Sequence, residues 1–372
     1  MIGPALVHGA PSWRVAASHV AAFVTVQGGH TGPVRYRLGD RWVSPGHVAP
    51  WAEEPTEDLP PMLRLLRGDF FCMPFGGGGG HPPHGETANA VWTLDDVAHE
   101  DDATTLVAHL DLTLGPGRVE KHVTLRDGHA AVYTQHVVRG ASGPMPLGHH
   151  AMLRFPDAEG SGLVAVSPFA KGFVAPEPIE TAETGGASSL APGATFDYLD
   201  AVPLAAGGTT DLSCYPARRG YEDLVLLASD PAPAFCWTAV TFPAEGYVWF
   251  ALKNPRALRA TVLWHSNGGR RYAPWNSRHV NVLGLEEVTS YFHYGLPISA
   301  EPNALTAQGI PTAIDLNPAT PLDVRYVTAV AAVPRGFDHV AAIEPEGGSH
   351  VRLTSRSGAH VGVPLDHGFV KG

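Results

Sequence analysis

Apolar and polar residues alternate with a period of two along much of the chain. The stretch Leu110-Asp111-Leu112-Thr113-Leu114 is one example, and this alternation is typical of a half-buried β-strand. The runs 119–126 and 130–138 flank Asp127-Gly128, a dipeptide that favours a tight hairpin turn. Further strands are predicted at 19–27, 88–94, 106–114, 224–228, 247–252, 260–265, 281–287, 323–333 and 340–343. No stretch has the pattern of an amphipathic helix longer than about three turns, so the sequence predicts an all-β fold with few short helices.

Composition supports the same fold class. The chain has 372 residues, of which 42 are Gly and 34 are Pro, and this content favours short strands joined by turns over long helices. The sequence has no repeat of fixed period, which argues against propellers and solenoids. We therefore expect residues 1–372 to form one large antiparallel β-sandwich, strongly curved, with a ligand on its concave face. Within it, the stretch 158–220 is rich in Ala, Gly, Pro and Thr and could be an irregular excursion over the surface.

Charge and cysteine content restrict the partners and the compartment. A formal net charge of −11 and a pI near 6.0 argue against nucleic acid or an anionic membrane as the main partner, so a small molecule fits better. The three cysteines are widely spaced and suggest neither a disulfide framework nor a zinc ribbon. The N-terminal residues lack a secretory pattern and no run of 18 apolar residues occurs, so we expect a cytoplasmic protein. A monomer or a homodimer is expected, since an edge strand such as 323–333 could pair between subunits.

A glycine run, Gly76 to Gly80, leads into His81-Pro82-Pro83-His84. A phosphate-binding loop is excluded, because it would end in Gly-Lys-Ser/Thr and open a helix. A metal site is a second interpretation, because polyproline II geometry places the two histidines on one side, but no spacing signature supplies further ligands. The third interpretation is a substrate loop in which the prolines fix the backbone of His84 and Gly85 allows a tight turn.

Three segments, taken in order, carry a family resemblance. They are Arg67-Gly68-Asp69-Phe70-Phe71-Cys72-Met73-Pro74-Phe75-Gly76 with His84-Gly85 and Trp92, then Leu147-Gly148-His149-His150-Ala151, and then Leu263 to Arg270 followed by Val282-Leu283-Gly284-Leu285-Glu286-Glu287. Their order and spacing resemble the aldose 1-epimerase (galactose mutarotase-like) superfamily. The resemblance implies the supersandwich fold of that family and an isomerase that interconverts the α and β anomers of an aldose.

That reaction needs one base and one acid on either side of the hemiacetal. The resemblance implies Glu286 as the base that takes the C1 hydroxyl proton, and His150, with His149 as the alternative, as the acid that protonates the ring oxygen. Neighbouring residues of a strand point to opposite faces, so only one member of each adjacent pair can reach the sugar. Alternation places Glu287 on the face of Leu283 and Leu285, and therefore does not by itself select Glu286.

The remaining candidates would hold the sugar. His84 would bind the ring oxygen or a neighbouring hydroxyl, and Arg67 would supply a fork of donors, unless it forms a structural ion pair with a residue such as Asp69. Asp223 resembles an acidic residue of the family that accepts hydroxyl hydrogen bonds, and Glu222 lies beside it. Three tryptophans could form aromatic platforms beneath the ring, namely Trp92, Trp264 and Trp275. No metal and no cofactor is expected.

Other functions remain open from the sequence. The same fold could serve as a non-catalytic carbohydrate-binding protein. A glycoside hydrolase would need a second carboxylate, from Asp223 or Glu287. A metal-dependent isomerase would use His81, His84, His149 and His293. The pairs Arg218-Arg219 and Arg270-Arg271 could bind a sugar phosphate, although paired surface arginines are usually solvated.

Overall fold

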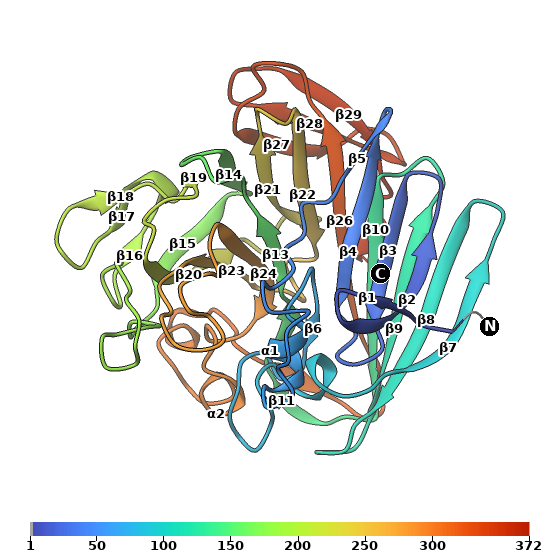
Figure 1. Ribbon diagram of the computed structural model, residues 1–372, viewed down its shortest axis with the longest axis horizontal. Helices are drawn as coiled ribbons and strands as arrows, with labels where there is room; N and C mark the ends of the chain where they lie inside the picture. Colours follow the sequence, from blue (N-terminus) through green and yellow to red (C-terminus); the bar gives the residue numbers. More distant parts are fainter. Residues whose placement is uncertain (1–2, 372) are drawn as a thin grey trace.

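The computed structural model describes residues 3–371, which form two large antiparallel sheets and several smaller ones (Figure 1). The nine-stranded sheet has the order β19 (Cys214–Tyr215), β14 (Gly162–Val166), β21 (Cys236–Phe242), β22 (Tyr247–Lys253), β26 (Leu322–Ala332), β10 (Ala131–Arg139), β9 (Arg118–Arg126), β8 (Ala103–Asp111) and β7 (Thr93–His99). The eight-stranded sheet has the order β16 (Thr195–Phe196), β15 (Phe169–Val174), β20 (Tyr221–Ser229), β23 (Ala260–Asn267), β24 (Val282–Thr289), β12 (Leu147–His149) and β6 (Phe71–Cys72), and β13 (Ala151–Arg154) also pairs with β24. The all-β, antiparallel prediction is confirmed.

The smaller elements surround these two sheets. A five-stranded sheet contains β1 (Ala5–Val7), β2 (Ala10–Ala16), β3 (Val20–Thr25), β4 (Thr31–Leu38) and β5 (Arg41–Val43), and a three-stranded sheet contains β27 (Val340–Pro345), β28 (His350–Ser355) and β29 (His360–Pro364). Two-stranded pairs are formed by β11 (Gly143–Met145) with β25 (Ile314–Leu316) and by β17 (Val202–Pro203) with β18 (Thr209–Thr210). The helices are α1 (Pro61–Leu65) and α2 (Leu296–Ser299), with 3-10 turns η1 (Glu86–Ala88), η2 (Leu199–Ala201), η3 (Thr306–Gln308) and η4 (Phe369–Lys371). No helix among the described residues is long and apolar enough to cross a membrane.

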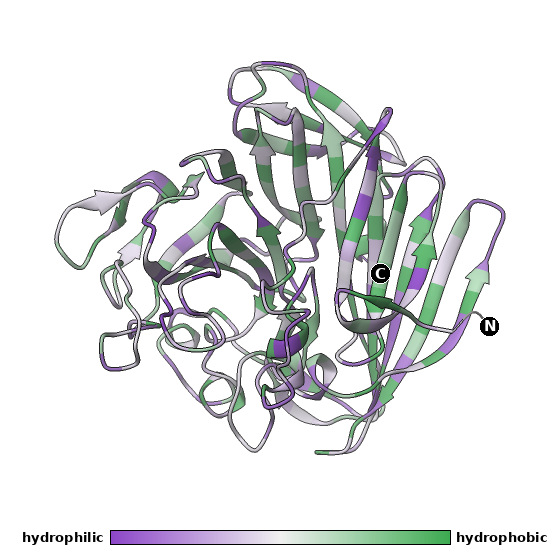
Figure 2. Ribbon diagram, in the orientation of Figure 1, coloured by the Kyte–Doolittle hydropathy of each residue, from purple (hydrophilic) through white to green (hydrophobic). Residues whose placement is uncertain are grey.

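Three apolar clusters hold the sheets together. The largest lies between the two large sheets, where Leu283 and Leu285 of β24 join the cluster that contains Trp249 of β22. A second cluster covers the other face of the eight-stranded sheet and includes Val282 and Val288 of β24. The third packs the strands β27 to β29 against the nine-stranded sheet. Hydrophobic residues accordingly run in bands along the strands of both large sheets (Figure 2). Both faces of β24 are therefore buried.

Several predicted strands coincide with observed ones, and three expectations were wrong. The hairpin at Asp127-Gly128 connects β9 to β10, as predicted. The predicted strand 88–94 begins too early: Ala88 ends η1, a turn follows, and β7 starts only at Thr93, because Asn89 donates to the carbonyl oxygens of Pro83 and Gly85 and so keeps this backbone folded back. The stretch 158–220 is not irregular throughout, since β14 and β15 enter the two large sheets. β26 is not an edge strand, because it pairs with β22 on one side and β10 on the other.

Candidate active site

The eight-stranded sheet separates two neighbouring glutamates of β24. Glu287 points between the large sheets, where its carboxylate lies 2.5 Å from Lys253 Nζ and accepts hydrogen bonds from Thr238 and Thr261. Glu286 points to the opposite side, which we call the pocket face, the face of this sheet that also carries Leu224 and Trp264. Glu286 is thus the glutamate of this pair that reaches the pocket, and Glu287 is committed to a buried ion pair.

The same separation applies to the two adjacent histidines. His150 reaches the pocket face, with its Nε2 3.2 Å from Glu286 Oε1 and its ring stacked on Phe70 at 4.6 Å. His149 points between the sheets, where Nδ1 lies 2.8 Å from Asp69 Oδ2 and the ring stacks on Tyr326 at 4.3 Å. The expectation that His149 binds the sugar, or replaces His150 as the acid, is therefore corrected.

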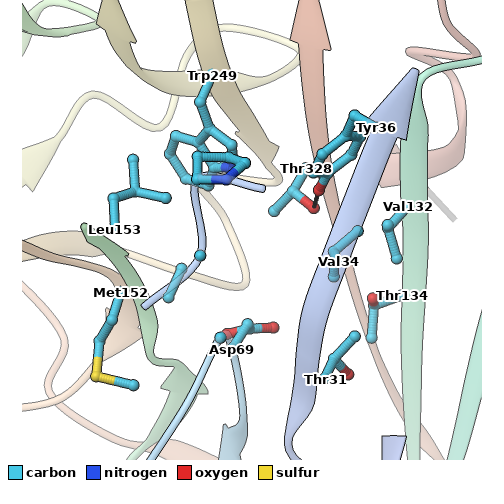
Figure 3. A pocket seen from close by; sticks show the side chains of 14 residues that line it. Thr31, Val34, Tyr36, Asp69, Val132, Thr134, Met152, Leu153, Trp249 and Thr328 are labelled. Carbon is cyan, nitrogen blue, oxygen red and sulfur yellow. Dashed lines mark hydrogen bonds between the residues drawn. The ribbon is translucent and has the colours of Figure 1, made fainter. Parts of the chain in front are cut away.

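A small cavity lies on the Asp69 side of this arrangement (Figure 3). Its volume is about 40 Å³, and Tyr36, Asp69 and Thr328 supply polar groups to its lining. The Tyr36 hydroxyl lies 3.2 Å from Thr328 Oγ1. A space of this size holds roughly three water molecules. It is too small for a sugar, so the side of the sheet that His149 faces offers no substrate site there.

The glycine run brings His84 to His150. A Cβ on Gly76 would lie 2.3 Å from the carbonyl oxygen of His293, and a Cβ on Gly295 would lie 1.5 Å from that of Gly77, so the two loops can pack backbone to backbone only as glycines. The His84 ring lies perpendicular to that of His150 at 5.0 Å. Its Nδ1 accepts a hydrogen bond from the Gly76 N–H at 3.3 Å, so a neutral His84 carries its proton on Nε2.

These side chains line a pocket of about 130 Å³. The lining consists of Met62, Leu63, Leu66, His84, His150, Ile179, Leu224, Trp264, Arg270, Trp275, Glu286 and His293. Five candidate residues from the sequence, namely His84, His150, Trp264, Trp275 and Glu286, thus lie together. Arg270 and His293 had been considered only as a phosphate ligand and a metal ligand, and no local pattern identifies them as pocket residues.

Arg270 is fixed by partners from distant segments. Its Nε lies 2.7 Å from Glu180 Oε1, which also accepts a hydrogen bond of 2.8 Å from the Tyr272 hydroxyl. Its guanidinium carbon stands 4.4 Å from the ring centre of Trp275 and 5.3 Å from that of Trp264. The guanidinium is therefore held against both tryptophans, and its charge is balanced by a buried carboxylate.

Two other expected sugar ligands lie elsewhere. Arg67 is fully buried and donates to the carbonyl oxygens of Val7, His8 and Leu65, so its donor fork ties the N-terminal segment to the sandwich. It forms neither the sugar contact nor the ion pair with Asp69 that the sequence suggested. Asp223 points away from the pocket face and accepts hydrogen bonds from Ser189 N–H, Ser189 Oγ–H and Leu190 N–H.

Glu222 takes the position on the pocket face that had been assigned to Asp223. Its carboxylate accepts hydrogen bonds from Trp264 Nε1 at 3.0 Å, Ser266 Oγ at 3.0 Å and Gly269 N at 3.2 Å. Burial raises the pKa of Glu222 to about 7, and the positive charge of Arg270 opposes this rise. Glu222 does not line the pocket but fixes the indole that does. Trp92 likewise lies away from the pocket, with its Nε1 donating to the Thr87 carbonyl.

Similarity to known proteins was found at the level of structure. The sequence matches no family model and no curated protein. A candidate aldose 1-epimerase from Escherichia coli superposes with a TM-score of 0.56 at 13% identity, covering 87% of this chain and 100% of that one. A galactose mutarotase related enzyme from Lactobacillus acidophilus has a TM-score of 0.54 at 11% identity, with 87% and 99% covered. A galactose mutarotase-like protein from Clostridium acetobutylicum has a TM-score of 0.54 at 12% identity, with 89% and 98% covered.

The chain has the galactose mutarotase-like fold. Within this fold, burial dominates the electrostatics of the pocket. Burial raises the pKa of Glu286 well above its ordinary value and lowers that of His150 well below its own. Burial also lowers the pKa of His84 to about 3 and that of His293 to about 4. Burial therefore favours the neutral form of these histidines, and in the pair of Glu286 and His150 it favours the proton on the carboxyl of Glu286.

The alternative site chemistries can be compared with the same geometry. Among the described residues, Glu286 is the one carboxylate that lines the pocket, because Glu287 and Asp223 face the other side of the sheet. The second carboxylate of a glycoside hydrolase is thus not provided by either candidate. No group of three or more His, Cys, Asp or Glu side chains arranged to hold a metal ion occurs in residues 3–371. His149 in particular is separated by the sheet from His84.

Proposed function

We propose that the protein interconverts the α and β anomers of an aldose by opening and closing the sugar ring. The observation that carries this proposal is the contact of 3.2 Å between His150 Nε2 and Glu286 Oε1 at a pocket lined by Trp264 and Trp275. A proton acceptor and a proton donor that line the same pocket can reach the two reacting oxygens of a hemiacetal, which are bonded to the same carbon. The fold is shared with proteins described as a galactose mutarotase related enzyme and a galactose mutarotase-like protein, and this supports a sugar as the ligand.

The chemistry follows from the single proton of the pair. With the carboxylate of Glu286 ionised and His150 protonated, Glu286 takes the proton of the C1 hydroxyl while His150 gives its proton to the ring oxygen, and the C1–O5 bond breaks to leave the open-chain aldehyde. Rotation about the C1–C2 bond presents the other face of the aldehyde. Closure reverses both proton transfers and yields the other anomer.

The burial of Glu286 and His150 favours the protonation state that the pair has after ring opening. After ring opening, Glu286 is protonated and His150 is neutral, and this is the state favoured by the raised pKa of the carboxyl and the lowered pKa of the imidazole. Before ring opening, the proton has to move from Glu286 to His150, and the contact of 3.2 Å provides the path. His84 lies beside the pair and directs its Nε2–H to a sugar oxygen.

Anomer exchange measured by NMR tests the proposal. A panel of aldoses, free and phosphorylated, is incubated with the wild type and with Glu286→Gln, which keeps the shape of the side chain and removes its base. Faster exchange of at least one sugar that is lost in the variant is the expected result. If no sugar exchanges faster but some bind equally well to both proteins, the protein is a binding protein and the catalytic proposal is wrong.

A further inference from the structure

The pocket has few side chains that could bind sugar hydroxyls besides Glu286 and His150. Seven of its twelve lining residues are apolar, including five aliphatic ones, and the polar ones are His84, His150, Arg270, Glu286 and His293. Among the described residues that form the lining, none is Asp, Asn, Gln, Ser or Thr. The volume of about 130 Å³ exceeds the 40 Å³ of the cavity beside Asp69 by more than threefold.

A single sugar ring would engage all five polar side chains of the pocket. Under the proposed function, Glu286 and His150 engage the C1 hydroxyl and the ring oxygen. His84, His293 and Arg270 then remain for the hydroxyls on C2, C3 and C4. Arg270 is partly occupied, since its Nε binds Glu180, and its balanced charge offers little to a phosphate or a carboxylate.

The aliphatic residues come from three separate parts of the chain. Met62 and Leu63 belong to α1, Leu66 follows it, Ile179 lies in a loop, and Leu224 is the cross-strand partner of Trp264. An exocyclic hydroxyl placed against such a surface loses its hydrogen bonds to water and finds no replacement, whereas a methyl group gains by leaving water.

We propose that the substrate is a 6-deoxyhexose, a pyranose with a methyl group in place of the hydroxymethyl group on C5. This inference names the substrate class of the proposed anomer exchange and rests on it for its kinetic test. The methyl group lies against the five aliphatic residues, and the ring hydroxyls are bound by His84, His293 and the part of Arg270 that Glu180 leaves available.

The test compares sugars that differ only at C6, namely D-fucose with D-galactose and 6-deoxy-D-glucose with D-glucose. Anomer exchange by NMR gives kcat/KM, and a titration of each sugar into the protein gives its Kd. We expect the better 6-deoxy sugar to exceed its parent hexose in kcat/KM by at least about tenfold, because an unpaired hydroxyl in an apolar site discriminates on this scale. Equal values, or a preference for the parent hexoses in both pairs, overturn the inference.

Two variants test whether the aliphatic residues of the pocket cause the preference for 6-deoxy sugars. Met62→Gln and Leu63→Gln each supply an amide for an exocyclic hydroxyl, and both positions are half-buried, so the fold should tolerate them. We expect at least one of them to reduce the ratio of 6-deoxy sugar to hexose by about fivefold or more, whereas Met62→Leu, the apolar control, keeps it. An unchanged ratio in both Gln variants, with thermal unfolding as in the wild type, shows that these residues do not set the preference and contradicts the inference.

Anomer exchange and sugar binding test the catalytic proposal and the ligand class separately. If no sugar exchanges faster but 6-deoxy sugars bind at least about tenfold more tightly than their parents, the catalytic proposal is wrong and the ligand class stands. If exchange is accelerated without this preference, the ligand class is wrong and the catalytic proposal stands. If the protein neither accelerates exchange nor binds any of these sugars, both the catalytic proposal and the ligand class are wrong.

Discussion

Glu286 and Glu287 are consecutive residues whose carboxylates lie on opposite sides of one sheet. Glu286 meets His150 at 3.2 Å, and Glu287 meets Lys253 at 2.5 Å between the sheets. Both are almost fully buried, so neither is a solvated surface carboxylate. The chain therefore offers two chemically identical side chains, one beside the proposed chemistry and one in the structural core, that can be changed in parallel.

The first prediction uses this pair. We expect Glu286→Gln to lower anomer exchange by at least about 100-fold, since it removes the base, and to leave the free energy of unfolding close to that of the wild type. Glu287→Gln should instead lower the free energy of unfolding by about 3 kcal/mol, because it leaves the charge of Lys253 uncompensated in the interior. NMR exchange and urea unfolding check the two effects. A Glu287→Gln protein that is fully stable but inactive would reverse the assignment.

The second prediction concerns the adjacent histidines. His150→Gln should lower exchange by about 100-fold or more, because it removes the acid that protonates the ring oxygen. His149→Gln should retain exchange per folded molecule and lose about 1–2 kcal/mol of stability, because Asp69 loses a hydrogen bond in the interior. Equal loss of exchange in both variants, at equal stability, would show that the faces assigned to these two side chains are wrong.

The third prediction concerns Gly284, which gives Glu286 its space. A Cβ at this position would lie 2.5 Å from Glu286 Oε1 and 3.0 Å from the Cβ of Trp264. Gly284→Ala should therefore displace the carboxylate and lower kcat by about tenfold or more, even though alanine suits a strand. Gly115→Ala is the matched control, because a Cβ there has no neighbour within 4 Å. If Gly284→Ala exchanges sugars as fast as the control, the position of Glu286 is less critical than we propose.

The fourth prediction is that mild acid destabilises the fold. Burial lowers the pKa of a set of eight histidines, namely His30, His47, His84, His136, His150, His265, His279 and His293. The unfolded chain takes up protons on them below about pH 6.5, whereas the folded protein keeps them neutral, so each costs up to about 1.4 kcal/mol per pH unit as the pH falls. Glu222 and Glu286 have raised pKa values and act in the opposite direction, because their unfolded forms ionise as the pH rises.

The eight histidines contribute more to the pH dependence of the free energy of unfolding than the two carboxyls do. This free energy should therefore fall steeply between pH 7 and pH 5. Urea unfolding at several pH values measures the slope, which gives the number of protons taken up on unfolding. His47→Asn serves as a control, since burial lowers the pKa of His47 to about 3 and its removal should reduce the uptake by about one proton. A free energy of unfolding that stays constant across this range would show that these histidines are protonated in the folded protein.

The sequence predicts strands such as β8 and β9 well because every second residue is buried, so that apolar and polar positions alternate. It does not select between Glu286 and Glu287, because all eight residues of β24 are buried and the usual contrast between an apolar and a solvated face is missing. The partners that distinguish the two glutamates come from other segments: His150 lies between β12 and β13, and Lys253 ends β22. The role of Arg67 could not be predicted either, because its hydrogen bonds go to the backbone of Val7 and His8, about sixty residues away.

The two adjacent acid residues have a consequence for how the chain folds. In the observed register Glu287 lies opposite Thr261, and its carboxylate reaches Lys253. A slip of β24 that brought Val288 opposite Thr261 would turn every side chain to the other face and remove the carboxylate of Glu287 from the ammonium of Lys253. The buried ion pair thus selects against this misalignment during folding, because the slipped strand would leave a charge unpaired in the interior.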